Sequence, residues 1–242
     1  MLGSERQREI LQYLQLYGSV SVKKLTGLVY ASEATVRRDL NELEQSGLVK
    51  RVFGGATLAI APDRQVPLYV REREDSAVKD ELCRRASELL RDGCVLFLDG
   101  SSTAQAMVRY LPRYRDLIVL TNGLNIVQML RDLHIKVYCT GGLLREDSSV
   151  FIGKSAETFL DGFHMDFCFI SCKGMDHEGR LSDTSEEETA LRQKVLRASD
   201  VRVLLLTGQK LGKSYLHTLG HSSDFDHIFT DAPLPEGIKL KT

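Results

Sequence analysis

The sequence predicts an α/β protein in two parts: a small amino-terminal domain of helices with a β-hairpin, then a larger domain with a mainly parallel sheet. Three observations support this prediction. The length of 242 residues is ample for a small module and a larger one. Residues 4–58 contain three segments with helical spacing of apolar residues, followed by two strand-like stretches. From about residue 75, strands rich in Val, Ile and Leu alternate with helices, which is typical of a parallel sheet.

The composition is that of a globular protein, with 43% hydrophobic and 27% charged residues. No apolar run approaches the roughly 18–20 residues of a membrane span, and the charged start is not a secretory signal. The five cysteines are odd in number and lie in apolar segments, which fits a reducing compartment. We therefore expect a cytoplasmic protein with no membrane partner. The six histidines lack ligand spacing, so we predict no metal and no cofactor.

The net charge of −1 conceals an asymmetry between the two parts. Residues 1–60 carry a net charge of +2, and the remainder carries −3. The chain is therefore not basic as a whole, and any contact with nucleic acid must be local.

Three helices are predicted in the first part. The first covers residues 4–17, and Gly18 ends it. A second follows, with Ser21 as its cap. Ser32 is well placed to cap a third helix that runs to about Gln45.

The third helix has one buried and one exposed face on a helical wheel. Arg38 lies opposite the apolar arc, and Thr35 and Arg37 lie on its flanks. Two short helices joined by a tight turn, the second exposing Thr and Arg near its start, match a helix-turn-helix. A major groove accepts one such helix, and an Arg there can bond guanine bidentately. The buried arc is formed by Val36, Leu40 and Leu43.

An alternative interpretation treats Arg37 and Arg38 as ordinary solvated charges. Their partners would be Glu33, Glu42 or Asp39 on the same helix. An isolated Arg-Arg pair favours this alternative, so the DNA-binding interpretation needs further support from the residues that follow.

A β-hairpin is predicted over residues 48–58, around the Gly54-Gly55 pair. Lys50 and Arg51 in this hairpin are placed to neutralise phosphates, as is Ser32, and the glycines permit close backbone approach. Three helices followed by such a wing make a winged helix, which favours DNA binding.

Residues 5–58 closely resemble the DeoR-type winged helix-turn-helix. The resemblance is carried by Ala31-Ser32-Glu33-Ala34-Thr35-Val36-Arg37-Arg38-Asp39-Leu40 and by Arg51-Val52-Phe53-Gly54-Gly55-Ala56. The Thr-x-Arg-Arg-Asp-Leu core with a downstream Gly-Gly wing is a specific signal. It implies sequence-specific binding to bacterial promoter DNA, usually as a repressor.

We assign residues 3–58 to the winged helix-turn-helix, 59–74 to a linker and 75–233 to the α/β domain. The linker contains two prolines and a charged run. Strands of the α/β domain are predicted over residues 94–98, 117–120, 135–139, 166–171, 201–206 and 227–230. Its helices are predicted over residues 77–90, 103–111, 124–131 and 186–198.

Polar loops follow four of these strands. Because parallel strands present their carboxyl ends at one edge of the sheet, the loops are expected to converge there. Their hydroxyls, glycines, amide and ammonium suit a small phosphorylated polyol, and the helix start after Gly100 favours an anion. Taken singly, each loop is equally explained as a helix cap or a turn. The candidate effector-binding residues are Asp99, Gly100, Ser101, Ser102, Thr103, Thr121, Asn122, Gly141, Gly142 and Lys210.

This part also resembles the DeoR carboxyl-terminal sensor domain. The motifs are Phe97-Leu98-Asp99-Gly100-Ser101-Ser102-Thr103, Leu120-Thr121-Asn122-Gly123 and Gly141-Gly142-Leu143-Leu144-Arg145. The resemblance implies a fold like ribose-5-phosphate isomerase and a sugar phosphate whose binding releases the protein from DNA. It places the ligand on the candidate loops named above.

Two short segments depart from the family pattern. Thr207-Gly208-Gln209-Lys210 stands where Asp-Ser-Ser-Lys is frequent, so the lysine remains and its acidic neighbour is lost. Asp183-Thr184-Ser185 stands where Thr-Pro-Asn is frequent. Both departures bear on which effector is bound.

The sequence thus predicts a non-enzymatic transcriptional regulator, a repressor of a sugar-metabolism operon that a phosphorylated sugar releases from operator DNA. A homo-oligomer, dimer or tetramer, is expected because helix-turn-helix proteins dock as pairs on two half-sites. The alternative is a phosphosugar isomerase with a DNA-binding appendage, for which Asp99 and Glu187 are the candidate proton-transfer groups. A purely structural module would leave the Thr-Arg-Arg helix and the wing without a purpose.

Overall fold

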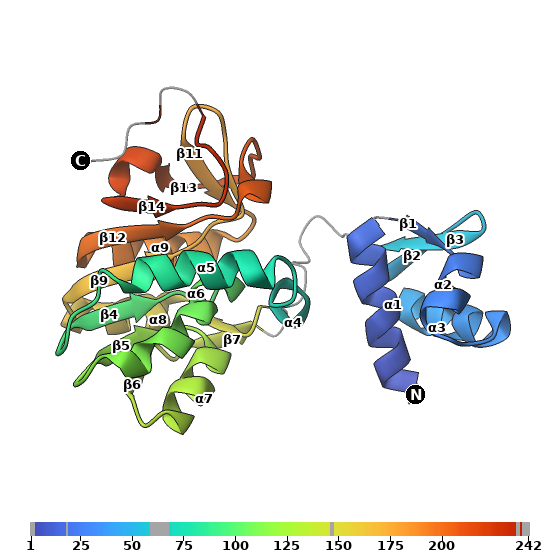
Figure 1. Cartoon of the computed structure of the whole chain (residues 1–242), viewed down its shortest axis with the longest axis horizontal. Coiled ribbons are helices and arrows are strands. Elements are labelled where there is room, and N and C mark those ends of the chain that lie inside the picture. The colour runs from blue at the N-terminus through green and yellow to red at the C-terminus, as the bar shows by residue number, and fades with distance from the viewer. Residues whose placement is uncertain (1–2, 18, 59–67, 146–147, 236–237, 239–242) are drawn as a thin grey trace. The chain divides into compact units, whose positions relative to one another are not determined.

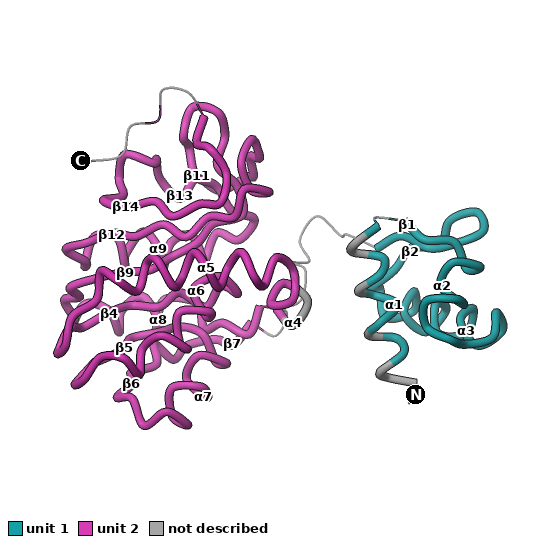
Figure 2. Tube along the Cα trace, in the orientation of Figure 1, with its two compact units in different colours: residues 1–64 teal, residues 65–242 magenta. Residues whose placement is uncertain are grey.

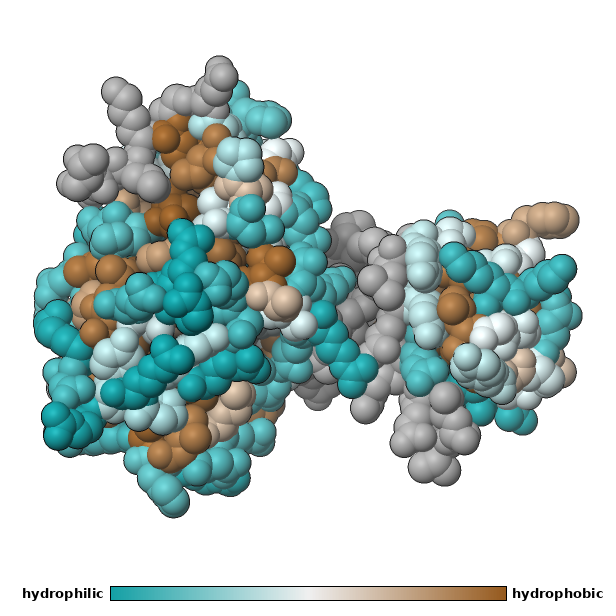
Figure 3. All heavy atoms as spheres, in the orientation of Figure 1, coloured by the Kyte–Doolittle hydropathy of each residue, from teal (hydrophilic) through white to brown (hydrophobic). Residues whose placement is uncertain are grey.

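The computed structural model describes residues 3–17, 19–58, 68–145, 148–235 and 238 of the chain (Figure 1). These residues form two compact units, Met1–Arg64 and Gln65–Thr242 (Figure 2). Among the described residues, the structure contains no helix with both the length and the apolar character of a membrane span. On the face shown in Figure 3, hydrophobic residues are interspersed with hydrophilic ones on both units.

Unit 1 contains the three predicted helices. They are α1 (Gly3–Tyr17), α2 (Val22–Leu28) and α3 (Glu33–Gln45). The two predicted caps are confirmed: Ser21 Oγ accepts from the amide of Lys24, and Ser32 Oγ from that of Thr35, each at 3.2 Å. The predicted arc of α3 is buried as well. Gly18, predicted to end the first helix, lies outside the described residues.

The predicted hairpin consists of β2 (Val49–Val52) and β3 (Gly55–Leu58). A third strand, β1 (Ser19–Ser21), pairs antiparallel with β3 and was not predicted, because three residues are too few to show an alternating pattern. A Cβ on Gly55 would overlap the carbonyl oxygen of Val20. The glycine at position 55 therefore allows two strands to approach, in addition to any role toward DNA.

Unit 2 is built on a six-stranded parallel sheet of order β14-β12-β9-β4-β5-β6 (Figure 1). All five pairings are parallel, which confirms the predicted fold class. The strands are β4 (Val95–Leu98), β5 (Ile118–Thr121), β6 (Lys136–Cys139), β9 (Met165–Ile170), β12 (Ser199–Leu205) and β14 (His227–Phe229).

Helices cover both faces of this sheet. Neighbouring residues of one strand point to opposite faces, so Leu96 and Phe97 of β4 belong to two different apolar clusters. One cluster includes side chains of α5 (Ser76–Ser87), η1 (Ala106–Arg113) and α7 (Leu124–Asp132). The other includes side chains of α8 (Lys154–Phe159), η2 (Leu160–Gly162) and α9 (Glu186–Arg197). The segment predicted as one helix over residues 103–111 is divided into α6 (Ser102–Gln105) and the 3-10 helix η1.

Several short elements were not predicted. They include α8 and η2, the hairpin β7 (Leu143–Arg145) and β8 (Val150–Ile152), the small antiparallel sheet β10 (Gly174–Met175), β11 (Arg180–Asp183) and β13 (His217–His221), and the single turns η3 (Gly208–Lys210) and η4 (Ser222–Asp224).

The predicted linker overlaps the start of unit 2. Unit 2 begins at Gln65, and α4 (Leu68–Arg71) lies within the segment 59–74 that the sequence analysis assigned to the linker. Leu68 is buried, which is consistent with a helix that packs within unit 2. Residues 59–67 of the predicted linker lie outside the described residues.

Candidate functional site

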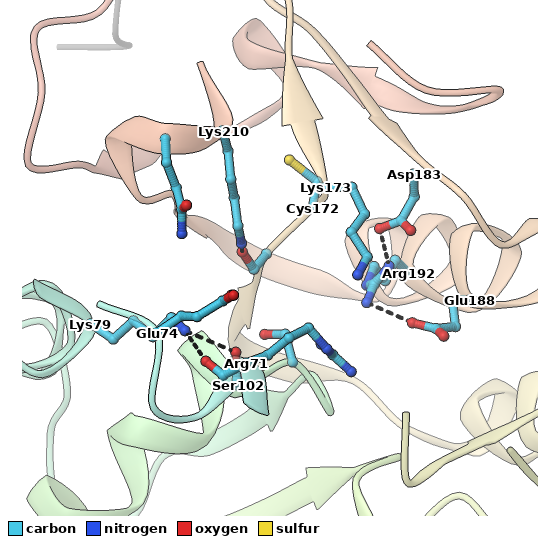
Figure 4. A pocket seen from close by; sticks show the side chains of 13 residues that line it. Arg71, Glu74, Lys79, Ser102, Cys172, Lys173, Asp183, Glu188, Arg192 and Lys210 are labelled. Atoms are coloured by element: carbon cyan, nitrogen blue, oxygen red, sulfur yellow. Dashed lines mark hydrogen bonds and ion pairs between the residues drawn. The ribbon is translucent and has the colours of Figure 1, made fainter. Parts of the chain in front are cut away.

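A pocket opens at the carboxyl ends of β4, β9 and β12, which are neighbours in the sheet (Figure 4). Its empty space of about 450 Å³ includes open solvent at the mouth of the pocket. Charged side chains dominate its lining, so we name it the cation pocket. Its basic residues are Arg71, Lys79, Lys173, Arg192 and Lys210, and its acidic residues are Glu74, Asp183 and Glu188.

One wall of the cation pocket is organised by Arg192 of α9. Its three guanidinium nitrogens donate to Asp99 at 3.0 Å, to Asp183 at 2.8 Å and to Glu188 at 3.0 Å. All four side chains are buried. Burial lowers the pKa of Arg192, but the three carboxylates outweigh burial and hold that pKa above its usual value. Arg192 is therefore a permanent cation that fixes three acids in place.

Two lysines on the other side of the pocket bind serine hydroxyls. Lys210 Nζ donates to Ser171 Oγ at 2.8 Å, and Ser171 Oγ in turn donates to the Leu205 carbonyl at 2.7 Å. Lys79 Nζ donates to Ser102 Oγ at 3.2 Å and to the carbonyl of Arg71 (Figure 4). Both ammonium groups are thereby held near the carboxyl ends of the parallel strands.

The basic groups of the pocket are buried and repel one another. Burial, followed by repulsion from Lys210, lowers the pKa of Lys79 to about 8. Burial, followed by repulsion from Arg71, lowers the pKa of Lys173 to about 8. Burial also lowers the pKa of Lys210. An anion placed among these groups would relieve both penalties, because it replaces lost solvation and offsets the repulsion.

The structure brings some of the predicted effector residues to this pocket. Ser101, Ser102 and Lys210 line it. Asp99 lies behind the lining, where it accepts hydrogen bonds from Arg192 and from the Ser171 amide at 2.9 Å. Its other carboxylate oxygen accepts from the amide of Ser101. Asp99 thus shapes the loop and orients Arg192.

Other predicted effector residues hold the neighbouring loops together. Asn122 Oδ1 accepts from the Gly100 amide at 2.9 Å, and Thr121 Oγ1 donates to the Leu98 carbonyl at 2.6 Å. A Cβ on Gly100 would overlap the side chain of Val150. The glycine therefore allows the loop after β4 to pack against the start of β8.

The remaining predicted effector residues do not line the cation pocket. Thr103 is buried in α6. Gly141 and Gly142 follow β6, the strand at the far edge of the sheet, and both have positive φ angles. A Cβ on Gly142 would lie 2.6 Å from the Ile152 carbonyl oxygen, so this glycine allows β8 to approach.

Sequence reasoning missed four basic residues of the pocket: Arg71, Lys79, Lys173 and Arg192. The signal for Lys173 was present, since it follows a predicted strand whose terminal loop was not considered. Arg192 and its partner Asp99 are 93 positions apart, and no local pattern connects them. Arg71 was assigned to the linker.

The predicted DNA-binding residues of α3 lie on its outer side. Arg38 is exposed and forms no ion pair with any residue that the structure describes. Arg37 is exposed and lies 3.8 Å from Glu33. Asp39 is buried and pairs with Arg6 of α1, one of the two hydrogen bonds measuring 3.0 Å. Of the ion pairs that the alternative interpretation suggested, the described residues show only that between Arg37 and Glu33.

The hydroxyls near the start of α3 bind each other, since Ser32 Oγ and Thr35 Oγ1 are 2.9 Å apart. In the wing, Lys50 is exposed. Arg51 instead reaches back to α3, where its Nη1 donates to Asn41 Oδ1 at 2.6 Å. This contact braces the wing against the helix. Phe53 lies in the turn between the wing strands and is fully exposed.

Family models match both units. The model of a "DeoR-like helix-turn-helix domain" matches residues 6–60, and that of the "DeoR C terminal sensor domain" matches residues 74–232. The chain belongs to the DeoR family of transcriptional regulators. Unit 1 is therefore the DNA-binding domain of a DeoR-family regulator, and unit 2 is its sensor domain.

Curated members of the DeoR family match nearly the whole chain. The L-fucose operon activator of Haemophilus influenzae is 30% identical over 234 residues, which cover 97% of this chain and 94% of that protein. The glycerol-3-phosphate regulon repressor of Escherichia coli K12 is 28% identical over 239 residues, covering 98% and 94%. Relatives of this DeoR-family chain thus include an activator and a repressor.

Among solved structures, ribose-5-phosphate isomerase A of Methanocaldococcus jannaschii aligns with a TM-score of 0.43 and 16% identity. The alignment covers 57% of this chain and 55% of that one.

Proposed function

We propose that this chain represses a sugar-metabolism operon, and that a small phosphorylated sugar in the cation pocket releases it from operator DNA. The observation that carries the proposal is the cation pocket itself, where lysines and an arginine with lowered pKa values gather at the carboxyl ends of three neighbouring parallel strands. Relatives named for the glycerol-3-phosphate regulon and the L-fucose operon support a phosphorylated or sugar-related signal.

On the DNA side, Arg38, Arg37 and Thr35 enter the major groove, and Arg38 reads a base edge. Ser32 and Lys50 contact phosphates, and Arg51 assists by holding the wing against α3. Two copies of the chain bind two half-sites about one helical turn apart.

On the effector side, the phosphate accepts hydrogen bonds from Lys210, Lys79 and Lys173. Ser101 and Ser102 donate to its oxygens or to sugar hydroxyls. Asp99, Thr121 and Asn122 support the loops rather than the ligand, and Gly141 and Gly142 do the same at the sheet edge. Coupling between the two ligands is expected to be about 1–3 kcal/mol, which is typical of allosteric proteins.

No catalytic role is part of the proposal. Both oxygens of Asp99 accept hydrogen bonds from fixed donors, and Glu187 is exposed and bound by Ser185 Oγ at 3.1 Å. Neither carboxylate is a free base in the pocket. Incubation of the protein with phosphopentoses and phosphohexoses should give no isomerised product by NMR, and turnover above a heat-treated control would favour the enzyme instead.

The direct test combines DNA and sugar. DNA from upstream of the gene is titrated with the protein by fluorescence anisotropy, and the complex is challenged with phosphorylated sugars and their unphosphorylated counterparts. Only a phosphorylated compound should lower DNA affinity. Lys210→Ala should bind DNA as well as the parent but require more of that compound for release. If no phosphorylated sugar changes DNA affinity, the proposed effector class is wrong.

Arg38→Ala tests the recognition helix. We expect it to weaken specific binding by about 1–3 kcal/mol and to relax base preference at one position. Arg131→Ala is the matched control, since it removes an exposed arginine from α7 of unit 2. Equal operator affinity of Arg38→Ala and the parent protein would show that α3 is not the reading helix.

A further inference from the structure

The segment that leads from unit 1 into unit 2 supplies part of the cation pocket. Residues 59–67 separate the end of β3 from α4, and the last residue of α4, Arg71, lines the pocket together with Glu74. In Figure 4 the side chain of Arg71 lies on the side of the pocket opposite Lys210. The first described residues of unit 2 therefore contribute to the wall of the cation pocket.

Polar contacts hold this segment on unit 2. The carbonyl of Arg71 accepts from Lys79 Nζ, which also binds Ser102 of the pocket. Glu72 Oε1 accepts from Gln105 Nε2 at 2.7 Å and from Asn125 Nδ2 at 3.2 Å. The first of these anchors is itself a pocket lysine, so a ligand that engages Lys79 acts directly on α4.

Burial opposes the docking of the Arg71 guanidinium: it lowers the pKa of Arg71 and outweighs the attraction of Glu188. Arg71 carries its guanidinium into a space that already holds Lys173 and Lys210. Burial, together with repulsion from Arg71, lowers the pKa of both lysines. A bound anion would offset both the burial and the repulsion, since it supplies a further counter-charge to all three cations.

We propose that Arg71 is a direct ligand of the effector's phosphate, and that effector binding clamps α4 onto unit 2. This inference rests on the proposed function, because it takes the cation pocket as the effector site. Occupancy of the pocket then changes the stability of the segment through which the chain passes to the DNA-binding unit. No further element is needed to transmit the signal, since Arg71 both contacts the ligand and belongs to the segment that leads to unit 1.

The test uses the full-length protein with inorganic phosphate as the probe, at constant ionic strength. Arg71→Met should weaken phosphate binding by about 10- to 100-fold in calorimetry, the loss typical of one charge-assisted hydrogen bond. Arg71→Lys should recover part of the affinity, which a loss of folding would not allow. Arg73→Met is the control, because Arg73 is exposed on the same segment and does not line the pocket.

Hydrogen exchange measures the clamp. In the parent protein, phosphate at 100 times its dissociation constant should slow amide exchange of the peptide covering residues 68–74 by up to about 100-fold, if only the docked form binds. In Arg71→Met, at a phosphate concentration giving equal occupancy, this slowing should be markedly smaller, since only the contact through Lys79 remains.

The outcomes separate the two proposals. If Lys210→Ala abolishes phosphate binding while Arg71→Met binds like Arg73→Met, the pocket is correct and the role of Arg71 is overturned. If Arg71→Met weakens binding but phosphate leaves exchange at residues 68–74 unchanged, the clamp is overturned. If the parent protein binds no phosphate, or Lys210→Ala binds as the parent does, the proposed function fails and this inference fails with it.

Discussion

Arg192 shows how a single side chain organises the sensor domain at the residue scale. Three carboxylates from β11, from α9 itself and from the loop after β4 meet its guanidinium, and none of them is exposed. Such a cluster stabilises only as a complete set, since removing the cation leaves buried acids without a partner. Each of the three carboxylates is thereby held in place by a hydrogen bond from Arg192.

Arg192→Met should therefore destabilise unit 2 by about 3–5 kcal/mol, the cost typical of breaking a buried ion pair. Urea denaturation followed by far-UV circular dichroism measures it. Arg197→Met, on the exposed last turn of the same helix, should change stability by no more than about 0.5 kcal/mol. Equal stability of the two variants would mean that the cluster contributes nothing net.

The lowered pKa values of Lys79 and Lys173 predict how anion binding depends on pH. Both ammonium groups lose their protons near pH 8, so affinity for an anion of fixed charge should fall as pH rises through about 8. Sulfate is a suitable probe, and the fall should approach tenfold per pH unit for each lysine that must be protonated. Lys79→Gln should give a flatter profile. A constant affinity from pH 7 to pH 9 would contradict the involvement of these lysines.

The same shifts fix the sign of a stability change without ligand. Between pH 8 and 10.5 the unfolded chain binds more protons at these lysines than the folded one. The contribution of both lysines to the free energy of unfolding should therefore rise with pH across that window. Below pH 8 both lysines are protonated in the folded protein, and their full destabilising effect is present.

At the scale of elements, β1 changes the interpretation of the wing. The wing strands β2 and β3 form a three-stranded sheet with β1, and a Cβ on Gly55 would overlap the carbonyl oxygen of Val20 in β1. The backbone of Val22 also donates to the Gly54 carbonyl at 2.9 Å. The start of α2 and the turn of the wing are therefore bonded to each other, which sets the wing relative to the helix-turn-helix.

Gly55→Ala should thus disrupt unit 1 by forcing β1 and β3 apart, at a cost of more than about 1 kcal/mol. Gly27→Ala is the control, since a Cβ there meets nothing within 4 Å. Thermal unfolding of both variants, read with operator affinity, checks the prediction. An unchanged unit 1 transition in Gly55→Ala would show that the strands separate without cost.

Long periodic elements could be predicted from the sequence, and short ones could not. The apolar arc of α3 and the serine caps depend on residues within one or two turns, so the pattern is visible locally. Strand β11 exists because Leu181 pairs with Gly220 of β13, and no local pattern predicts such a partner. The candidate site followed the same rule: the loop serines and Lys210 were found at strand ends, whereas Arg71 and Arg192 reach the pocket from distant elements.

At the scale of the whole molecule, each unit has an apolar core of its own. The core of unit 1 includes Ile10, Leu25 and Leu40, and the two clusters of unit 2 lie on the faces of its sheet. Units with separate cores are expected to unfold separately.

Calorimetry of the full chain should therefore show two transitions. A phosphorylated compound at 100 times its dissociation constant should stabilise unit 2 by about 2.7 kcal/mol and raise its transition alone. Operator DNA should raise the transition temperature of unit 1 alone. A single cooperative transition that both ligands shift equally would contradict independent units.

The exposed ring of Phe53 has a practical consequence. The chain contains no tryptophan, and this ring stands in the turn of the wing with its whole surface in solvent. Phe53→Trp would give the protein a single indole at that tip, and its emission would report on the surroundings of the wing. The approach of unlabelled DNA to one defined point of the protein then becomes visible in a stopped-flow fluorimeter.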